Sequence, residues 1–184
     1  MKYEIEIDYP IPENRAGIIK VYKQKVPAMR FIGKNYGNVS YPNWDDAWSI
    51  DLFGKIEKAS GGEDKIHALY EDSDAYCGLF YRNIETGEYN AWLGMFAPPG
   101  TEIPEELNFI DFPEQNLGVC WIYGKIPEVY GLIPQCPDII NSAGMEILSD
   151  DNGFICHFER DQCPRLTTPD KKGNIILDYC YVLK

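Results

Sequence analysis

The stretch LGVCWIYG, residues 117–124, decides the fold, because an apolar strand pattern begins there for the second time along the chain. A comparable stretch, AMRFIGKNY, occupies residues 28–36. Each is followed by a helical pattern and then by two further strand patterns, and equivalent points lie roughly 85 residues apart. We therefore expect two strand–helix–strand–strand repeats, over about residues 27–110 and 111–184, within one domain over residues 27–184. An arm over residues 1–26 would precede them.

The helical patterns differ between the repeats. Residues 43–59 carry one apolar stripe at three- and four-residue spacing, formed by Trp44, Ala47, Trp48, Leu52, Phe53 and Ile56. Residues 127–143 carry a second stripe, but Pro134 and Pro137 fall inside it and predict a kinked or interrupted helix. Strands are expected over residues 75–82, 88–96, 154–160 and 174–183. These patterns predict an α+β fold in which an antiparallel sheet carries helices on one side and a ligand cleft lies between the halves.

The composition excludes several classes of protein. The chain has 184 residues, of which 45% are hydrophobic and 14% aromatic, so it is not a disordered chain. Its formal net charge of −12 argues against a nucleic-acid groove. No run approaches the ~20 apolar residues that span a bilayer, and the N-terminus has no apolar signal segment. We expect a cytoplasmic protein with neither a membrane nor a nucleic acid as direct partner.

The six cysteines do not suggest a metal site. They are Cys77, Cys120, Cys136, Cys156, Cys163 and Cys180, and no two of them have C-x-x-C spacing. The two histidines, His67 and His157, are far apart in the sequence. We expect free thiols, no metal and no cofactor.

Several segments together resemble the GyrI-like small-molecule-binding domain, also called the AraC-type effector-binding domain. They are WLGMF (92–96), PGTEIP (99–104), IDFP (110–113), LGVCWIYG (117–124) and FER (158–160). The resemblance covers residues 27–184 and rests on their order and spacing. The resemblance implies that the chain is related to the drug-sensing module of multidrug transcription regulators of the BmrR and Rob type. That module also occurs alone. Only 26 residues precede the first repeat, so we expect no DNA-binding domain.

The resemblance also implies a glutamate at the base of an aromatic cleft, and Glu159 stands in the matching segment. Candidate walls of that cleft are aromatic residues: Trp48, Trp92, Trp121, Tyr76, Tyr81, Tyr123, Tyr179 and Tyr181. A carboxylate in such surroundings would attract a lipophilic cation, which the rings would also bind by cation–π attraction. Two simpler interpretations compete: Glu159 on a solvated strand, and the stripe of Trp44 and Trp48 in the core. His157 lies on the same strand face as Glu159. Its side chain would either line the cleft too or lie in the core or on the surface.

Three functions remain open at this point. The first is a stand-alone binding domain for amphipathic, cationic or heteroaromatic compounds, acting by sequestration or as a sensor that docks onto a separate regulator. The second is a cofactor-free hydrolase that opens cyclopropane-bearing electrophiles, as a subset of the family does, with Glu159 as general base and Tyr123 as proton or hydrogen-bond donor. The third is an acidic protein-interaction module that acts on a nucleic-acid enzyme.

Overall fold

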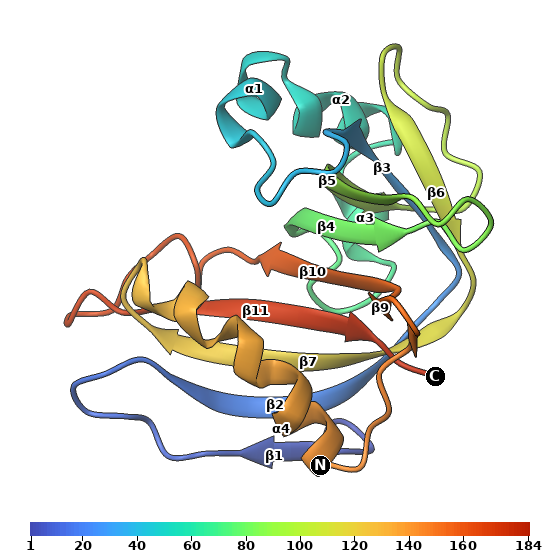
Figure 1. Cartoon of the computed structure of the whole chain (residues 1–184). Coiled ribbons are helices and arrows are strands. Elements are labelled where there is room, and N and C mark those ends of the chain that lie inside the picture. Colours follow the sequence, from blue (N-terminus) through green and yellow to red (C-terminus); the bar gives the residue numbers. More distant parts are fainter. The chain divides into compact units, whose positions relative to one another are not determined.

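The computed structural model describes residues 1–184 and divides them into two compact units. Unit 1 combines residues 1–25 with residues 116–184, and unit 2 comprises residues 26–115. Each unit contains paired antiparallel strands together with short helices, as Figure 1 shows. The α+β class predicted from the sequence is confirmed.

Unit 1 is built on five neighbouring strands. Their order is β1-β2-β7-β11-β10, with β1 at Glu6–Asp8, β2 at Gly17–Val26, β7 at Gln115–Gly124, β10 at Cys156–Asp161 and β11 at Ile175–Val182. A small hairpin joins β8 (Ser149–Asp150) to β9 (Gly153–Phe154). The N-terminal residues that we expected to form an arm thus contribute two strands to this unit.

The interrupted helix predicted for residues 127–143 takes the form of two segments. A 3-10 helix, η1, spans Glu128–Gln135 and contains Pro134, and α4 then spans Cys136–Ser142 with a proline in its first turn. Proline suits that position because its missing N–H would lack a partner there anyway. Val129, Cys136 and Ile140 of these helices are fully buried in one core with Cys120, Ile122 and Leu177 of the strands.

The strand register assigns the side chains of unit 1 to two faces. Tyr179 of β11 lies opposite Glu159 of β10 on one side and opposite Cys120 of β7 on the other. Directly opposed residues point to the same face of a sheet, and neighbours along a strand alternate. Since Cys120 packs with α4, Glu159 and Tyr179 belong to the helix-covered face, whereas Trp121 and Asp178 belong to the helix-free face.

Unit 2 has four strands in the order β4-β5-β3-β6. Their bounds are β3 at Met29–Asn35, β4 at Tyr76–Arg82, β5 at Tyr89–Ala97 and β6 at Asn108–Phe112. The single helix expected over residues 43–59 is divided into α1 (Trp44–Ser49) and α2 (Leu52–Ala59), because Asp51 takes a left-handed conformation with φ of 53°. A third helix, α3, spans Glu63–His67.

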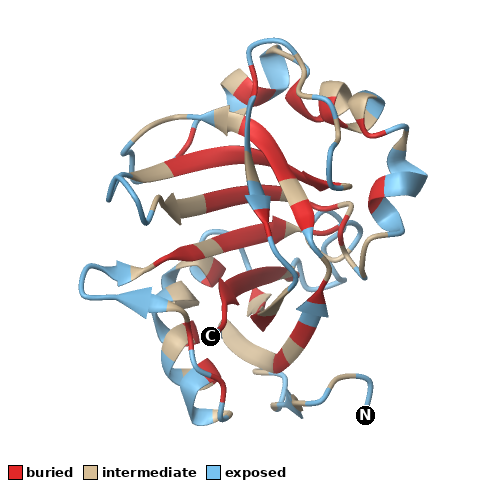
Figure 2. Ribbon diagram, turned by 90° about the vertical axis from the view of Figure 1, so that its right-hand side faces the viewer, coloured by how far each residue is buried: buried red, intermediate tan, exposed pale blue.

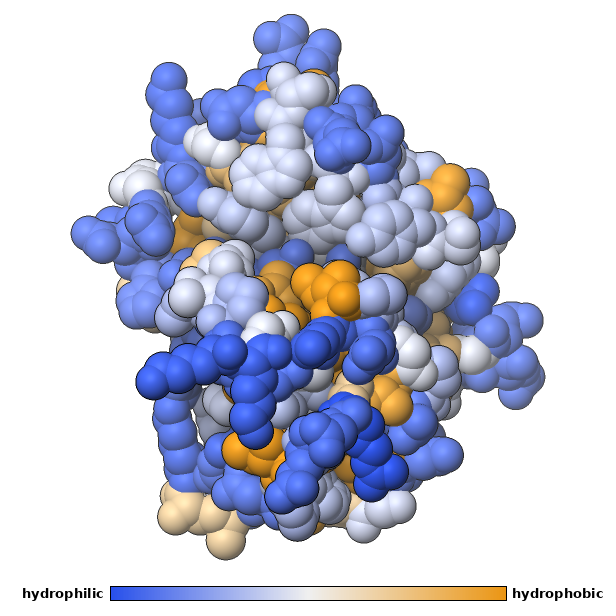
Figure 3. All heavy atoms as spheres, turned by 90° about the vertical axis from the view of Figure 1, so that its left-hand side faces the viewer, coloured by the Kyte–Doolittle hydropathy of each residue, from blue (hydrophilic) through white to orange (hydrophobic).

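The core of unit 2 lies between its helices and one face of its strands. Leu52, Phe53 and Ile56 of α2 pack against Leu93 and Met95 of β5. In both units the buried residues concentrate in the strands and the exposed ones in the connections, as Figure 2 shows. On the side of the molecule drawn in Figure 3, hydrophilic side chains cover much of the surface and hydrophobic residues form only small separate patches.

Candidate functional site

The first candidate residue, Glu159, lies in the middle of β10 and is only 6% exposed. Its cross-strand neighbour is Tyr179, and the next pair on the same face is His157 with Tyr181. Both tyrosines are also buried. A carboxyl group and two phenol rings therefore share the helix-covered face of unit 1.

Aromatic rings pack against one another on the strand face that carries Glu159. The centroid of Tyr181 lies 5.4 Å from that of His157, in a stacked arrangement, and 5.5 Å from that of Tyr179. Phe154, which comes from β9, approaches Tyr181 edge-on at 5.1 Å. We call these five residues, Phe154, His157, Glu159, Tyr179 and Tyr181, the Glu159 cluster.

His157 brings no positive charge to the Glu159 cluster. Its Nδ1 atom lies 2.8 Å from the hydroxyl oxygen of Tyr179, within hydrogen-bonding distance. Burial disfavours the imidazolium form and lowers the pKa of His157 to about 4. The imidazole is therefore neutral near pH 7.

Asp161 continues the same strand face two residues beyond Glu159. Burial, together with the nearby charge of Asp178, raises the pKa of Asp161 to about 7. Its Oδ1 atom is buried without a hydrogen-bond partner. Near neutral pH this carboxyl group is thus partly protonated, and its negative charge is reduced.

A different set of charges occupies the helix-free face of unit 1. Arg160 and Asp178 are both fully buried, and the guanidinium Nε and Nη2 atoms donate to Oδ2 of Asp178 at 3.0 and 2.8 Å. Arg160 also donates to Gln24 and to the hydroxyl of Tyr22, each at 2.8 Å. Arg165 adds two hydrogen bonds to Asp178, at 2.8 and 2.5 Å. These groups satisfy one another, which is the pattern of a structural ion-pair network.

Trp121 also lies on the helix-free face, where two cations approach its ring. The Arg165 guanidinium is 4.8 Å and the Lys20 ammonium 5.1 Å from its centroid. Tyr123, on the same face, donates a hydrogen bond to Asp170 at 2.5 Å and accepts one from Asn174 at 2.8 Å. The register therefore brings Tyr179 and Tyr181 to the face of Glu159, but it places Trp121 and Tyr123 on the opposite face.

The four remaining candidate residues belong to unit 2, where they also divide between two faces. Tyr76 stacks on Phe53 at 4.2 Å, and Trp48 contacts both rings at about 5 Å. Trp48 keeps 54% of its surface exposed, so it is not a core residue, whereas Trp44 stacks on Phe53 and packs against the core. Tyr81 and Trp92 lie on the helix-free face, Tyr81 beside Phe112.

Phe154 is the member of the Glu159 cluster that the sequence analysis did not select. It lies three residues before His157, outside β10, so alternation along one strand gives no signal for it. A bend at Ile155, the single residue between β9 and β10, interrupts the alternation, and the ring of Phe154 contacts Tyr181.

The potential metal ligands of the chain are not clustered, and its cysteines are not paired. No three His, Cys, Asp or Glu side chains are grouped so that they could hold a metal ion. All six cysteines are free thiols, and five of them are buried. None of the helices has the length and apolar character needed to cross a membrane.

Comparisons with known proteins identify the fold. No family model matches the chain, and no curated protein resembles it in sequence. Among solved structures, SAV2435 bound to tetraphenylphosphonium superposes with a TM-score of 0.61 and 12% identity, over 89% of this chain and 93% of the other. A bacterial transcription regulation protein from Staphylococcus aureus superposes with a TM-score of 0.58 and 13% identity, over 89% of this chain and 97% of the other. The EcmrR C-terminal domain superposes with a TM-score of 0.52 and 11% identity, over 89% of this chain and 96% of the other.

These likenesses extend over almost the whole of each compared chain. At such low identity they establish the fold and not the activity. The chain has the GyrI-like fold that its sequence resembles.

Proposed function

We propose that this chain is a binding domain for small amphipathic molecules, cationic or heteroaromatic, and that the Glu159 cluster is part of its binding site. The observation that carries the proposal is the burial of Glu159, which is 6% exposed beside Tyr179. Buried glutamates are uncommon in protein interiors because removing a carboxylate from water costs free energy. A buried carboxylate among rings is therefore more than a solvated strand residue.

The chemistry of the Glu159 cluster favours a cation with an apolar body. A carboxylate attracts a cation by its negative charge, and phenol rings attract cations through their π faces. The neutral imidazole of His157 does not compete for this charge. The Glu159 cluster thus combines one acidic group with apolar ring surface, which suits an amphipathic cation better than a neutral or anionic compound.

The comparison with SAV2435 points the same way. That protein was solved with tetraphenylphosphonium, a lipophilic cation. It shares the fold of this chain at 12% identity, so it supports the class of ligand and says nothing about individual contacts.

The proposal is tested by replacing Glu159 with its neutral isostere. Tetraphenylphosphonium binding, measured by titration calorimetry, should be at least about tenfold weaker in Glu159→Gln, because the cation loses its Coulomb attraction to the carboxylate, which reaches roughly 4 kcal/mol at a separation of about 4 Å and an effective dielectric constant of about 20. The matched control is Glu146→Gln, which removes an exposed carboxylate of the same unit that pairs with Lys184. It should bind as the wild type does.

A neutral ligand of similar size, triphenylphosphine oxide, separates charge from shape. Its affinity should be the same in the wild type and in Glu159→Gln. Equal affinity of both proteins for tetraphenylphosphonium would exclude Glu159 from the site. Ring-opened product from a spirocyclopropane substrate, formed by catalytic amounts of protein, would favour the hydrolase instead.

A further inference from the structure

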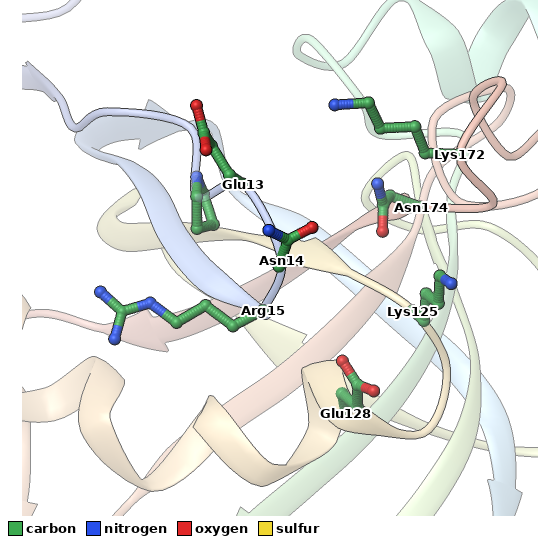
Figure 4. Close-up of a pocket in the computed structure, with 8 residues that line it drawn as sticks. Glu13, Asn14, Arg15, Lys125, Glu128, Lys172 and Asn174 are labelled. Atoms are coloured by element: carbon green, nitrogen blue, oxygen red, sulfur yellow. The ribbon is translucent and has the colours of Figure 1, made fainter.

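Unit 1 contains a cavity of about 300 Å³ at the end of its sheet where β7 ends and β2 and β11 begin. Three segments surround it: the loop before β2, the start of η1, and the turn before β11. Apart from Pro12, all of its lining side chains are charged or carry an amide, as Figure 4 shows. Its volume is at the lower end of the range for small-molecule sites.

The charges in this polar pocket are unusual for the chain. Arg15, Lys125 and Lys172 line it, although acidic residues outnumber basic ones by 29 to 17 overall. Some lysines elsewhere pair with carboxylates, as Lys20 does with Glu6 and Lys23 with Glu4. The three cations of the pocket form no ion pair, even though Glu13 and Glu128 line the same cavity.

The side chains differ in how they face the cavity. In Figure 4, Asn14 and Asn174 project toward each other from opposite walls, and Lys172 and Lys125 flank Asn174. The guanidinium of Arg15 extends away from the other groups. Lys125 and Lys172 are therefore the cations best placed for a ligand, with two amides beside them.

The wall that carries Lys172 and Asn174 is held by an organised turn. The Oδ1 atom of Asp170 accepts hydrogen bonds from the backbone N–H groups of Lys172 and Asn174, at 2.8 and 3.0 Å. Its Oδ2 atom accepts one from Tyr123, whose oxygen in turn accepts one from the Asn174 amide. These bonds hold the pKa of Asp170 near 2, so the carboxylate keeps the turn in place at any physiological pH.

The opposite wall depends on a close backbone approach. A Cβ atom on Gly124 would lie only 2.6 Å from Cβ of Ala16, in the loop that carries Asn14 and Arg15. Gly124 also has a φ of 156°, which side chains rarely adopt. Glycine at this position thus allows the loop to approach the end of β7 and close the pocket.

We propose that the polar pocket binds small anions that carry hydroxyl groups, either phosphate monoesters or hydroxycarboxylates. Lys125 and Lys172 bind the anionic group, and the amides of Asn14 and Asn174 bind the hydroxyls. This site differs in chemistry from the aromatic Glu159 cluster, and its ligand would be distinct from the amphipathic compounds proposed there. Because its cations are exposed, binding should be weak, with a dissociation constant on the order of 1 mM, and sensitive to salt.

Nuclear magnetic resonance titration of the full chain suits such an affinity. Glucose 6-phosphate and gluconate represent the two sources of negative charge, and glucose is the neutral control. At least one of the two anions should produce saturable shifts at Gly173 and at the side-chain amides of Asn14 and Asn174, and glucose should produce none. The anion that binds more tightly identifies the preferred acidic group.

Substitutions then assign the binding to the pocket. Lys125→Gln and Lys172→Gln should each weaken anion binding at least about threefold. Lys23→Gln, which removes a cation of the same unit that is paired with Glu4, should leave it unchanged. Glu159→Gln should also leave it unchanged, which separates this proposal from the proposed function. The absence of saturable shifts with both anions at about 20 mM, or equal affinities in all four variants, would overturn it.

Discussion

His157 and Asp161 share one face of β10, and burial moves their pKa values in opposite directions. The pKa of His157 falls to about 4 and that of Asp161 rises to about 7. In each case the neutral form is favoured, because a charge is costly away from water. At the scale of single residues, burial on this strand face thus favours the neutral forms of His157 and Asp161, the residues on either side of Glu159.

The lowered pKa of His157 predicts a loss of stability in acid. An unfolded chain protonates this histidine below its ordinary pKa of about 6.5, whereas the folded chain resists protonation until about pH 4. The contribution is present above pH 6.5 and is lost as the pH falls toward 4, by up to roughly 3 kcal/mol. Urea unfolding at pH 7.5 and 4.5 should therefore show a smaller acid-induced loss in His157→Asn than in the wild type.

The other histidine provides the control for this measurement. His67 is exposed, with 69% of its side-chain surface accessible, so His67→Asn should retain the acid-induced loss of the wild type. Asp161 acts in the opposite direction over the same range, since its raised pKa favours the folded state at low pH. Asp161 is unchanged in all three proteins, so its contribution to the pH dependence of stability cancels in the comparison. An equal loss in His157→Asn and the wild type would contradict the assignment.

At the scale of elements, hydrophobic periodicity predicted most helices and strands but not the break between α1 and α2. The stripe over residues 43–59 continues across α1 and α2, because Trp44, Leu52 and Phe53 all pack toward the same core. The break at Asp51 leaves that stripe intact, so the pattern contains no signal for it. An aspartate tolerates the left-handed conformation better than most residues, but it does so in many places where no helix ends.

Alternation also could not determine which strand face the helices cover. It correctly separates Glu159 from Arg160, but both are buried, and both faces of β11 carry mostly apolar or aromatic residues apart from Asp178. The cross-strand register resolves the ambiguity, and it depends on contacts between residues far apart in the sequence. For this reason the nine candidate residues could be selected as rings and a carboxylate, but their division between two faces could not.

The pairing of β3 with β5 depends on two glycines that face each other. Gly33 lies opposite Gly94, and a Cβ atom on either would overlap a backbone carbonyl of the partner strand. Gly94→Ala should therefore force the strands apart and lower the free energy of unfolding by at least about 2 kcal/mol, within the range for overpacked cores. Urea unfolding followed by circular dichroism measures this change.

A glycine outside this strand pair, Gly131, serves as the control for the substitution. Gly131 of η1 has open space where its Cβ would lie, so Gly131→Ala should be neutral or stabilising by up to about 1 kcal/mol. Equal stability of Gly94→Ala and the wild type would mean that the two strands tolerate a wider spacing.

At the scale of the whole molecule, unit 1 is formed by the two ends of the chain. The first 25 residues join the unit that otherwise comprises residues 116–184. Composition identifies part of β2 as apolar, but no local pattern specifies a partner so distant in the sequence, so the sequence alone predicts an arm over these residues. The hydrogen bonds of Arg160 supply the missing connection, since they reach Tyr22 and Gln24 across 138 and 136 residues.

The buried network around Arg160 therefore predicts a large and specific loss of stability. Arg160→Met would leave Tyr22 and Gln24 without this donor and Asp178 with Arg165 alone, and breaking a buried pair costs about 3–5 kcal/mol. Arg30→Met is the matched control, because Arg30 forms an equivalent two-point contact with Asp111, whose side chain is 57% exposed. It should cost about 1 kcal/mol, as surface pairs do. Urea unfolding of the two variants measures both values. Similar losses in both would mean that Arg165 compensates for Arg160, and that the link between β2 and β10 contributes little to folding.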